Sequence, residues 1–226
     1  MNSNTDRIKT KPMIKRLLPG VFLLITFLQA EAQKDWTLKL NKENIAVYTK
    51  TPANSDFKAI KVDCELNTTL TKLTAVVLDA NAGTEWVYST KSSVLLKQVS
   101  PSELYYYSEV KLPWPLSNRD FIAHLIATQD PITKVVTING PVEPDYLPEK
   151  KGIVRVHKSS GKWVITPRGS NRIRLEYTLE TDPGGSIPAW LVNMFATKGP
   201  FETFKRLKVQ LDKPKYASVK LPFIIE

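Results

Sequence analysis

The feature that most constrains this chain is a change in hydrophobic period near residue 182. Between Val94 and Thr181, short apolar runs alternate with polar residues, as they do in β-strands. Proline, glycine, asparagine and serine separate these runs and supply turns. After residues 182–185 the apolar positions follow helical spacing as far as Leu211. The pattern predicts strands at residues 94–99, 104–112, 121–128, 134–138, 153–157, 162–166 and 173–181, followed by one long helix.

A shorter stretch of strand and helix precedes these runs. Ile45–Lys50 and Phe57–Leu66 have strand character, and a helix is expected from Leu70, after cap-type residues at 67–69. Short turns join antiparallel neighbours, so we expect the strands to form an antiparallel meander. Gly199-Pro200 is expected to kink or split the terminal helix.

This order of elements favours an α+β fold, in which helix packs on one face of a sheet. A long, strongly twisted sheet curls, and its apolar concave face must be covered. The terminal helix is the only predicted element long enough to cover it. We therefore expect a curved antiparallel β-sheet wrapped around a long C-terminal α-helix. Periodicity leaves open whether side chains fill the space between sheet and helix or leave a cavity.

The first 32 residues have the order of a secretory signal peptide. A basic region ends at Arg16, Leu17–Leu28 is almost wholly apolar, and Ala30-Glu31-Ala32 provides a cleavage site. A membrane anchor is the alternative, but the apolar run has 12 residues, against the roughly 20 that a spanning helix needs. We expect residues 1–32 to be a removed signal, 33–212 one domain and 213–226 a C-terminal tail. The protein would then be periplasmic or secreted.

The chain is basic and carries a single cysteine, Cys64, so it has no intrachain disulfide. Its net charge of +10 falls to +7 without the predicted signal, which contains five basic and two acidic residues. Such a balance favours transient contact with anionic surfaces such as phospholipid headgroups. The basic residues are not clustered with aromatic ones, as nucleic-acid binding would require. We expect a monomer with no nucleic-acid partner.

Residues that could support catalysis or hold a metal are scarce. Two histidines and one cysteine are too few for a zinc site with the usual ligand spacing. Asp120 and His124 share one side of a predicted strand, but at ~3.3 Å per residue they stand about 13 Å apart, too far to hydrogen-bond. The sequence contains no P-loop, dinucleotide-binding glycine motif or nucleophile elbow. We expect no catalytic residue, no cofactor and no metal.

Four short strings, in order and with similar spacing, resemble the START (StAR-related lipid transfer) family of the helix-grip, Bet v 1-like superfamily. They are Glu85-Trp86, Asn118–Phe121, Leu147–Arg155 and Ile187–Asn193. The resemblance extends from about Trp36 to Leu211. It implies a sheet that grips the C-terminal helix, with a tunnel between them holding one lipid or other hydrophobic small molecule. Sterols, phospholipids and ceramides are the ligand classes of this family.

Strand alternation and the resemblance together suggest which side chains face the ligand. Arg119, Phe121, Ala123 and Leu125 share one side of a predicted strand, and ordinary core packing is the alternative for this row. The full set of candidate ligand-binding residues is Tyr105, Tyr107, Glu109, Arg119, Phe121, Ala123, Leu125, Val156, Tyr177, Val192, Phe195, Ala196, Gly199 and Thr203.

Two charged residues in this set need separate comment. Glu109 resembles the acidic tunnel residue that sterol-binding members pair with an arginine, but Leu125 stands at the arginine's position. Glu109 would therefore need another partner, a polar ligand group or a raised pKa, unless it faces solvent. Arg119 resembles a family residue that is usually held in a structural ion pair, with ligand contact as the alternative.

Three functions follow from these observations. The first is a non-enzymatic lipid carrier or sensor with an apolar cavity. The second is a helix-grip enzyme, such as a polyketide cyclase-like protein or hydrolase, in which Glu109 or Tyr107 supplies acid–base chemistry. The third is an adhesion or scaffold module whose core is filled. A cavity between sheet and helix separates the first two from the third.

Overall fold

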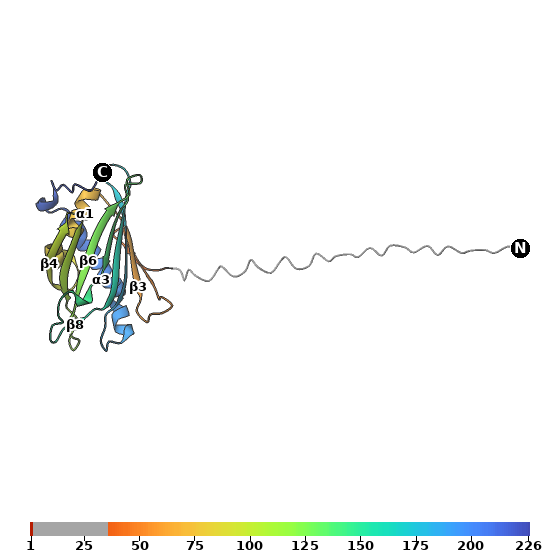
Figure 1. Ribbon diagram of the computed structural model, residues 1–226, viewed down its shortest axis with the longest axis vertical. Coiled ribbons are helices and arrows are strands. Elements are labelled where there is room, and N and C mark those ends of the chain that lie inside the picture. Colours follow the sequence, from red (N-terminus) through yellow and green to blue (C-terminus); the bar gives the residue numbers. More distant parts are fainter. Residues whose placement is uncertain (2–35) are drawn as a thin grey trace. The chain divides into compact units, whose positions relative to one another are not determined.

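The computed structural model describes Met1 and residues 36–226. The predicted signal peptide lies outside the described residues, apart from Met1. The strands form one curved sheet around the long helix α3, as Figure 1 shows. They are β1 (Thr37–Lys42), β2 (Ile45–Lys50), β3 (Ala59–Leu66), β4 (Thr90–Ser100), β5 (Glu103–Val110), β6 (Arg119–Gln129), β7 (Val136–Pro141), β8 (Val154–Arg155), β9 (Lys158–Pro167) and β10 (Ile173–Asp182). The helices are α1 (Leu70–Leu78), α2 (Gly83–Trp86) and α3 (Ala189–Leu211), with 3-10 turns η1 (Ala80–Ala82), η2 (Pro144–Tyr146) and η3 (Pro214–Tyr216).

The α+β class and the helix-grip architecture are confirmed, but the sheet is not a simple meander. Its order is β1-β2-β3-β10-β9-β7-β6-β5-β4, so β3 lies beside the last strand. The reason is that α1 and α2 follow β3, and that the chain then enters β4 at the opposite edge of the sheet. This leaves a place for β10 next to β3. β8, predicted as five residues, is two residues long and pairs parallel with β6 outside this path.

α1 begins where the cap-type residues predict. Thr69 is the N-cap, and its side-chain oxygen accepts a hydrogen bond from the Lys72 backbone N–H at 3.1 Å. The first two N–H groups of the helix, those of Leu70 and Thr71, donate to the Glu226 carboxylate at 3.0 and 2.9 Å. A side chain at the far end of the chain therefore completes the cap of this helix.

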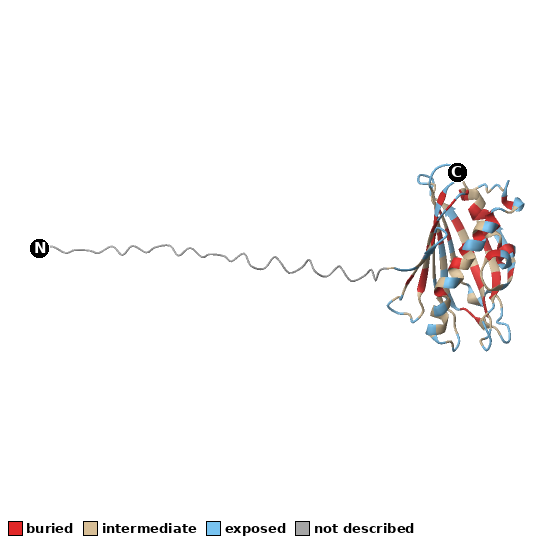
Figure 2. Ribbon diagram, turned by 180° about the vertical axis from the view of Figure 1, so that it is seen from behind, coloured by how far each residue is buried: buried red, intermediate tan, exposed pale blue. Residues whose placement is uncertain are grey.

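α3 runs unbroken through Gly199-Pro200, so of the predicted kink or split, the split is wrong. Pro200 removes one intrahelical hydrogen bond, but Phe201 and Phe204 directly after it are buried and hold the second half against the core. Figure 2 shows this division: buried residues concentrate in the C-terminal half of α3, while the N-terminal half, apart from Ala196, is half-buried or exposed. The two halves of α3 therefore have different packing.

Residues 213–226, the predicted C-terminal tail, pack onto the domain. Tyr216 is buried, and the apolar residues Val219, Leu221, Phe223 and Ile224 contact the core. The Gln129 side chain and the Ile225 backbone exchange two hydrogen bonds of 2.7 and 2.8 Å. Among the described residues, no helix is long and apolar enough to cross a bilayer.

Candidate functional site

A cavity of about 420 Å³ lies between the concave face of the sheet and α3. This volume falls within the roughly 300–1,000 Å³ of small-molecule pockets. The walls come from strands β3–β7, β9 and β10 and from helices α1, α2 and α3, and most of the lining side chains are apolar. The space between sheet and helix is therefore hollow, which the sequence pattern left open.

The two ends of the cavity differ. At the deep end, the rings of Trp163, Tyr177 and Phe204 pack together with centroids 4.4 to 5.7 Å apart. The other end, which we call the loop end, is lined by residues of two loops and the segment before α3: Phe57, Leu112, Leu116 and Ile187. Here the Lys58 N–H donates to the Asn193 side chain at 2.9 Å, which ties a loop to the first turns of α3.

Most of the predicted ligand-facing side chains lie in the wall of this cavity. The β6 row of Arg119, Phe121, Ala123 and Leu125 is there, as the strand alternation predicts. The others are Val156, Tyr177, Val192, Phe195, Ala196, Gly199 and Thr203. Contact with a ligand stays a prediction for each of them.

Tyr105, Tyr107 and Glu109 do not line the cavity, so the predicted orientation of β5 is wrong. The register pairs Tyr106 with Ala123 and Ser108 with Phe121, and paired residues of antiparallel strands share a face. Tyr106, Ser108 and Val110 therefore face the cavity, and the three predicted residues lie on the convex side. Both faces of β5 contain aromatic and polar residues, so alternation alone does not identify the inner one.

The convex side of β5 is covered by the segment that leads through η2 to β8. Tyr105 stacks on His124 and on Tyr146, with ring centroids 4.0 and 4.7 Å apart. The Lys150 ammonium lies over the Tyr107 ring at 3.8 Å from its centroid. These contacts explain why Tyr107 is buried and Tyr105 half-buried although they face away from the cavity.

Glu109 forms hydrogen bonds with two polar side chains outside the cavity. Its Oε1 accepts hydrogen bonds from Lys91 Nζ at 2.9 Å and Asn118 Nδ2 at 2.7 Å. Burial raises the pKa of Glu109, but these two hydrogen bonds outweigh it and hold the pKa below its ordinary value. The alternative of a raised pKa is therefore wrong, and Glu109 is a charged residue of the convex side.

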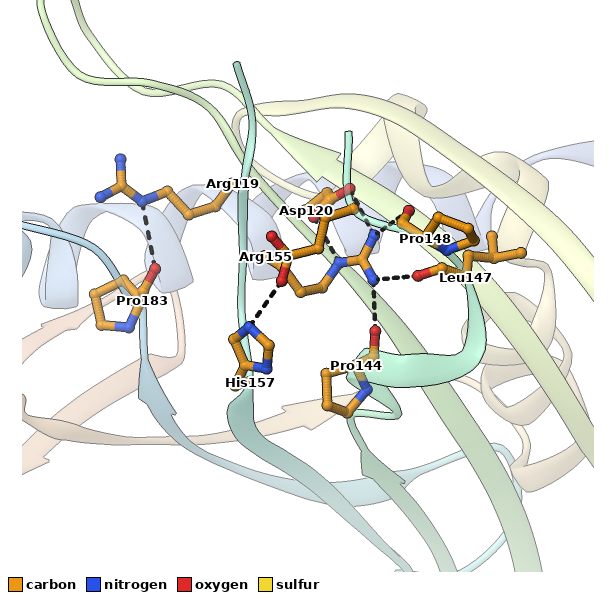
Figure 3. A network of polar contacts seen from close by, with 9 residues as sticks. Arg119, Asp120, Pro144, Leu147, Pro148, Arg155, His157 and Pro183 are labelled. Atoms are coloured by element: carbon orange, nitrogen blue, oxygen red, sulfur yellow. Dashed lines mark hydrogen bonds and ion pairs between the residues drawn. The ribbon is translucent and has the colours of Figure 1, made fainter. Parts of the chain in front are cut away.

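An ion pair joins β6 to β8 on this same side. Arg155 donates through Nε and Nη2 to the two carboxylate oxygens of Asp120 at 2.8 and 3.1 Å, and both side chains are buried. Figure 3 shows the Arg155 guanidinium surrounded by the carbonyls of η2 and the following loop, which come from Pro144, Leu147 and Pro148. Hydrogen bonding to Asp120 raises the pKa of Arg155.

Arg119, one residue earlier, is on the cavity side and lacks such a partner. Its Nη1 donates to the Ser117 carbonyl at 2.6 Å, Nη2 to Gly184 at 3.2 Å and Nε to Pro183 at 3.3 Å. No ion pair reaches Arg119 from the residues that the structure describes. The predicted ion pair of Arg119 is therefore wrong, because the carboxylate beside it, Asp120, points to the other face of the sheet (Figure 3).

Comparison with known proteins assigns the family. The START domain family model matches residues 27–215. The chain belongs to the START domain family. An uncharacterised protein of Pseudomonas aeruginosa is 31% identical over 180 residues, which cover 80% of this chain and 88% of the relative. The mouse phosphatidylcholine transfer protein is 29% identical and is matched over 75% of this chain and 83% of its own length. A crystal structure of a STAR-related lipid transfer protein from Xanthomonas axonopodis superposes with a TM-score of 0.73 at 32% identity, covering 79% of this chain and 99% of that one.

The family strings occupy defined places in this START domain. Residues 118–121 begin β6 and supply both Arg119 and Asp120, and residues 147–155 lead into β8 and supply the partner, Arg155. Residues 187–193 open α3, and Trp86 at the end of α2 lines the cavity. The strings thus mark the buried ion pair, the cavity wall and the start of the helix that covers it.

Sequence reasoning missed several residues of the cavity wall. Tyr106 and Ser108 follow once β5 is paired with β6, and Trp163 lies directly opposite Tyr177 in the β9–β10 pair. Burial raises the pKa of Tyr106 to about 12 and also raises that of Tyr177, so both phenols are neutral. The described residues contain no cluster of three or more side chains suited to hold a metal ion.

Proposed function

We propose that this START domain binds one lipid in the cavity between its sheet and α3 and transfers it through water without chemical change. The observation that carries the proposal is the apolar cavity of about 420 Å³ under the half-exposed part of α3. Membership in the START family supports lipid binding or transfer in general. An apolar ligand gains about 25 cal/mol per Å² of surface removed from water, which can hold it in the cavity.

A phospholipid is the ligand that we favour. The similarity to the mouse phosphatidylcholine transfer protein supports this class. A sterol is less well supported, because Leu125 replaces the arginine of sterol-binding members and Glu109 lies outside the cavity. The acid–base groups that an enzyme on this scaffold would use, Glu109 and Tyr107, are also on the convex side. A carrier therefore fits the cavity better than a cyclase or hydrolase.

Release of the ligand requires an opening, and we propose that the N-terminal half of α3 provides it. Its residues 189–195 are half-buried or exposed, whereas Phe204 and Leu207 anchor the second half in the core. Segments with few buried contacts open at the lowest free-energy cost. The loop end of the cavity lies beside these same turns.

We propose that the loop end docks on an anionic membrane surface. Trp114, Trp190 and Met194 are exposed, and their neighbours Leu112, Leu116 and Leu191 line the cavity. Tryptophan is suited to the interface between water and lipid because its ring is apolar and its N–H can stay hydrated. The net positive charge of the chain adds attraction to anionic headgroups.

We also propose that the protein is exported and acts as a monomer in the periplasm or outside the cell. The order of a basic region, an apolar run and Ala30-Glu31-Ala32 supports removal of the first 32 residues. N-terminal sequencing of the protein from its host should give Gln33 as the first residue. An uncleaved chain found in the membrane fraction would contradict export by a cleaved signal.

A cavity-filling variant tests the main proposal. Ala196 lines the cavity, whereas Val209 on the same helix is exposed. Ala196→Trp should abolish binding of fluorescent phospholipid and its transfer between vesicles, while Val209→Trp should behave as wild type. Thermal unfolding verifies that both variants are folded. Undiminished lipid binding by folded Ala196→Trp would contradict the proposed site.

A further inference from the structure

Arg119 is a buried cation in an otherwise apolar wall. It is the first residue of β6 and 6% exposed, and its side chain lines the loop end of the cavity beside Pro183 and Gly184. Burying a charge is costly unless hydrogen bonds and an opposite charge compensate for it. The compensation that Arg119 receives is therefore informative about what the cavity holds.

Arg119 donates hydrogen bonds to backbone carbonyls alone. Three of its N–H groups donate to Ser117, Pro183 and Gly184, while a guanidinium carries five N–H donors. Two donors are thus left without a partner among the described residues, and no carboxylate lies within ion-pair distance there. Burial lowers the pKa of Arg119, with no described acidic group opposing it.

The buried charge of Arg155, by contrast, is compensated by a carboxylate. Arg155 has three carbonyl partners as well, but both oxygens of Asp120 complete its shell. Figure 3 shows the two arginines on opposite sides of the sheet, with Asp120 turned toward Arg155. The cavity-side arginine is therefore the one with a free positive charge.

The glycine turn before α3 shapes this site. Gly184 and Gly185 have φ of +67° and +66°, which other residues rarely adopt. This backbone lets the Gly184 carbonyl reach Arg119, and a Cβ at Gly185 would lie 3.6 Å from Arg119 Nη2. The turn thus holds the guanidinium in place and leaves its remaining donors for a ligand.

We propose that Arg119 is an anion-binding subsite that recognises the phosphate of a lipid ligand at the loop end of the cavity. The inference rests on the proposed function and deepens it, because it makes selection depend on an anionic oxygen group as well as on acyl chains. A phosphate can accept two N–H donors from one guanidinium. Lipids without such a group would leave the charge uncompensated and bind less tightly.

The test compares two lipids that differ only in the phosphate. Dioctanoyl phosphatidic acid and dioctanoylglycerol compete with a fluorescent acyl probe for the full protein. Because hydrogen bonds to charged groups contribute more than neutral ones, wild type should bind the phosphatidic acid about tenfold or more tightly. Inorganic phosphate and glycerol 3-phosphate test whether a free anion suffices. We expect neither to displace the probe, and displacement by them would overturn recognition of a lipid phosphate.

Variants then assign the preference to Arg119. Arg119→Gln should bind both lipids with the affinity that wild type has for dioctanoylglycerol, and Arg119→Lys should keep part of the preference. Arg174→Gln, which removes an exposed arginine that pairs with Asp63, should behave as wild type. Retention of the full preference by folded Arg119→Gln would overturn the assignment.

A spectroscopic readout on wild type covers the case in which the variants do not fold. The ¹⁵Nε resonance of Arg119 should shift on addition of the phosphatidic acid and stay in place with dioctanoylglycerol. Equal shifts, or equal affinities, would overturn the Arg119 subsite while leaving lipid binding intact. Failure of both lipids to bind would instead contradict the proposed function itself.

Discussion

Asp120 and Arg155 form a bidentate ion pair, with N–O distances of 2.8 and 3.1 Å, and it fastens the start of β6 to β8. Both side chains are almost wholly shielded from water. The pair lies on the opposite face of the sheet from the cavity, with Arg119 as its neighbour on the cavity side. The arrangement separates a structural charge from one that is available to a ligand.

Breaking this pair should destabilise the fold. Asp120→Ala leaves a buried guanidinium without its counter-charge, so the free energy of unfolding should fall by about 3–5 kcal/mol. Asp63→Ala removes the partner of the exposed Arg174 and should cost at most about 1 kcal/mol. Urea unfolding of the two variants measures the difference. Similar losses in both would show that burial of the Asp120–Arg155 pair contributes little.

The Glu226 cap on α1 should make stability depend on pH. Burial raises the pKa of Glu226, but hydrogen bonds from Thr71 and Leu70 outweigh it and leave the pKa lowered. A carboxyl with a lowered folded-state pKa stabilises the fold above its unfolded pKa, and this contribution is lost as pH falls through the folded value.

Glu226→Gln should therefore lower the free energy of unfolding by about 0.5–1 kcal/mol at pH 7. The gap between the variant and wild type should be smaller at pH 3 than at pH 7, because the contribution of the Glu226 charge declines below the ordinary glutamate pKa of about 4.3 and is lost as pH falls through the lowered folded value. Denaturant unfolding at the two pH values measures it. A gap of the same size at both would contradict a role for the charge.

Two helix glycines should respond in opposite ways to alanine. A Cβ at Gly83 would lie 2.5 Å from Ser93 Oγ, whereas one at Gly199 would meet Tyr88 at an ordinary 3.5 Å. Gly83→Ala should cost about 1–3 kcal/mol through overpacking. Gly199→Ala should be neutral or stabilise α3 by up to about 1 kcal/mol. Thermal unfolding distinguishes them, and equal melting temperatures would contradict the tight packing of α2 on β4.

Removing the exposed tryptophans should slow transfer without weakening ligand binding. Trp114→Ser with Trp190→Ser should lower the rate of lipid transfer between anionic vesicles about tenfold, because less apolar surface enters the membrane interface. Ile132→Ser is the control, since Ile132 is exposed in the turn between β6 and β7, away from the cavity. An equal effect of the control would contradict docking through the loop end.

Most strands and the cavity-facing side chains of β6 could be predicted, because a period of two in apolar residues indicates which face of a strand is buried. β2 spans the predicted residues 45–50, and Phe121, Ala123 and Leu125 line the cavity. β1 was not predicted, because its alternation is limited to Leu38 and Leu40 and the strand is mostly exposed. The inner face of β5 could not be chosen from its own residues, since pairing with β6 decides it.

The partner of Asp120 was also beyond local reasoning, because Arg155 lies 35 residues along the chain. Pairing of β8 with β6 brings the two together, and no spacing rule covers a contact of that range. The same contact determines that Arg119 is without a carboxylate. The uncompensated charge of Arg119, on which the proposed choice of ligand rests, therefore depends on tertiary structure.

Lipid bound to the protein from its native host tests the central claim most directly. Native mass spectrometry of the full complex, followed by solvent extraction, should give one lipid per protein chain. The extracted lipid should carry a phosphate, as Arg119 predicts. Protein that is recovered empty, and stays empty after incubation with phospholipid vesicles, would contradict a lipid-carrying function for this cavity.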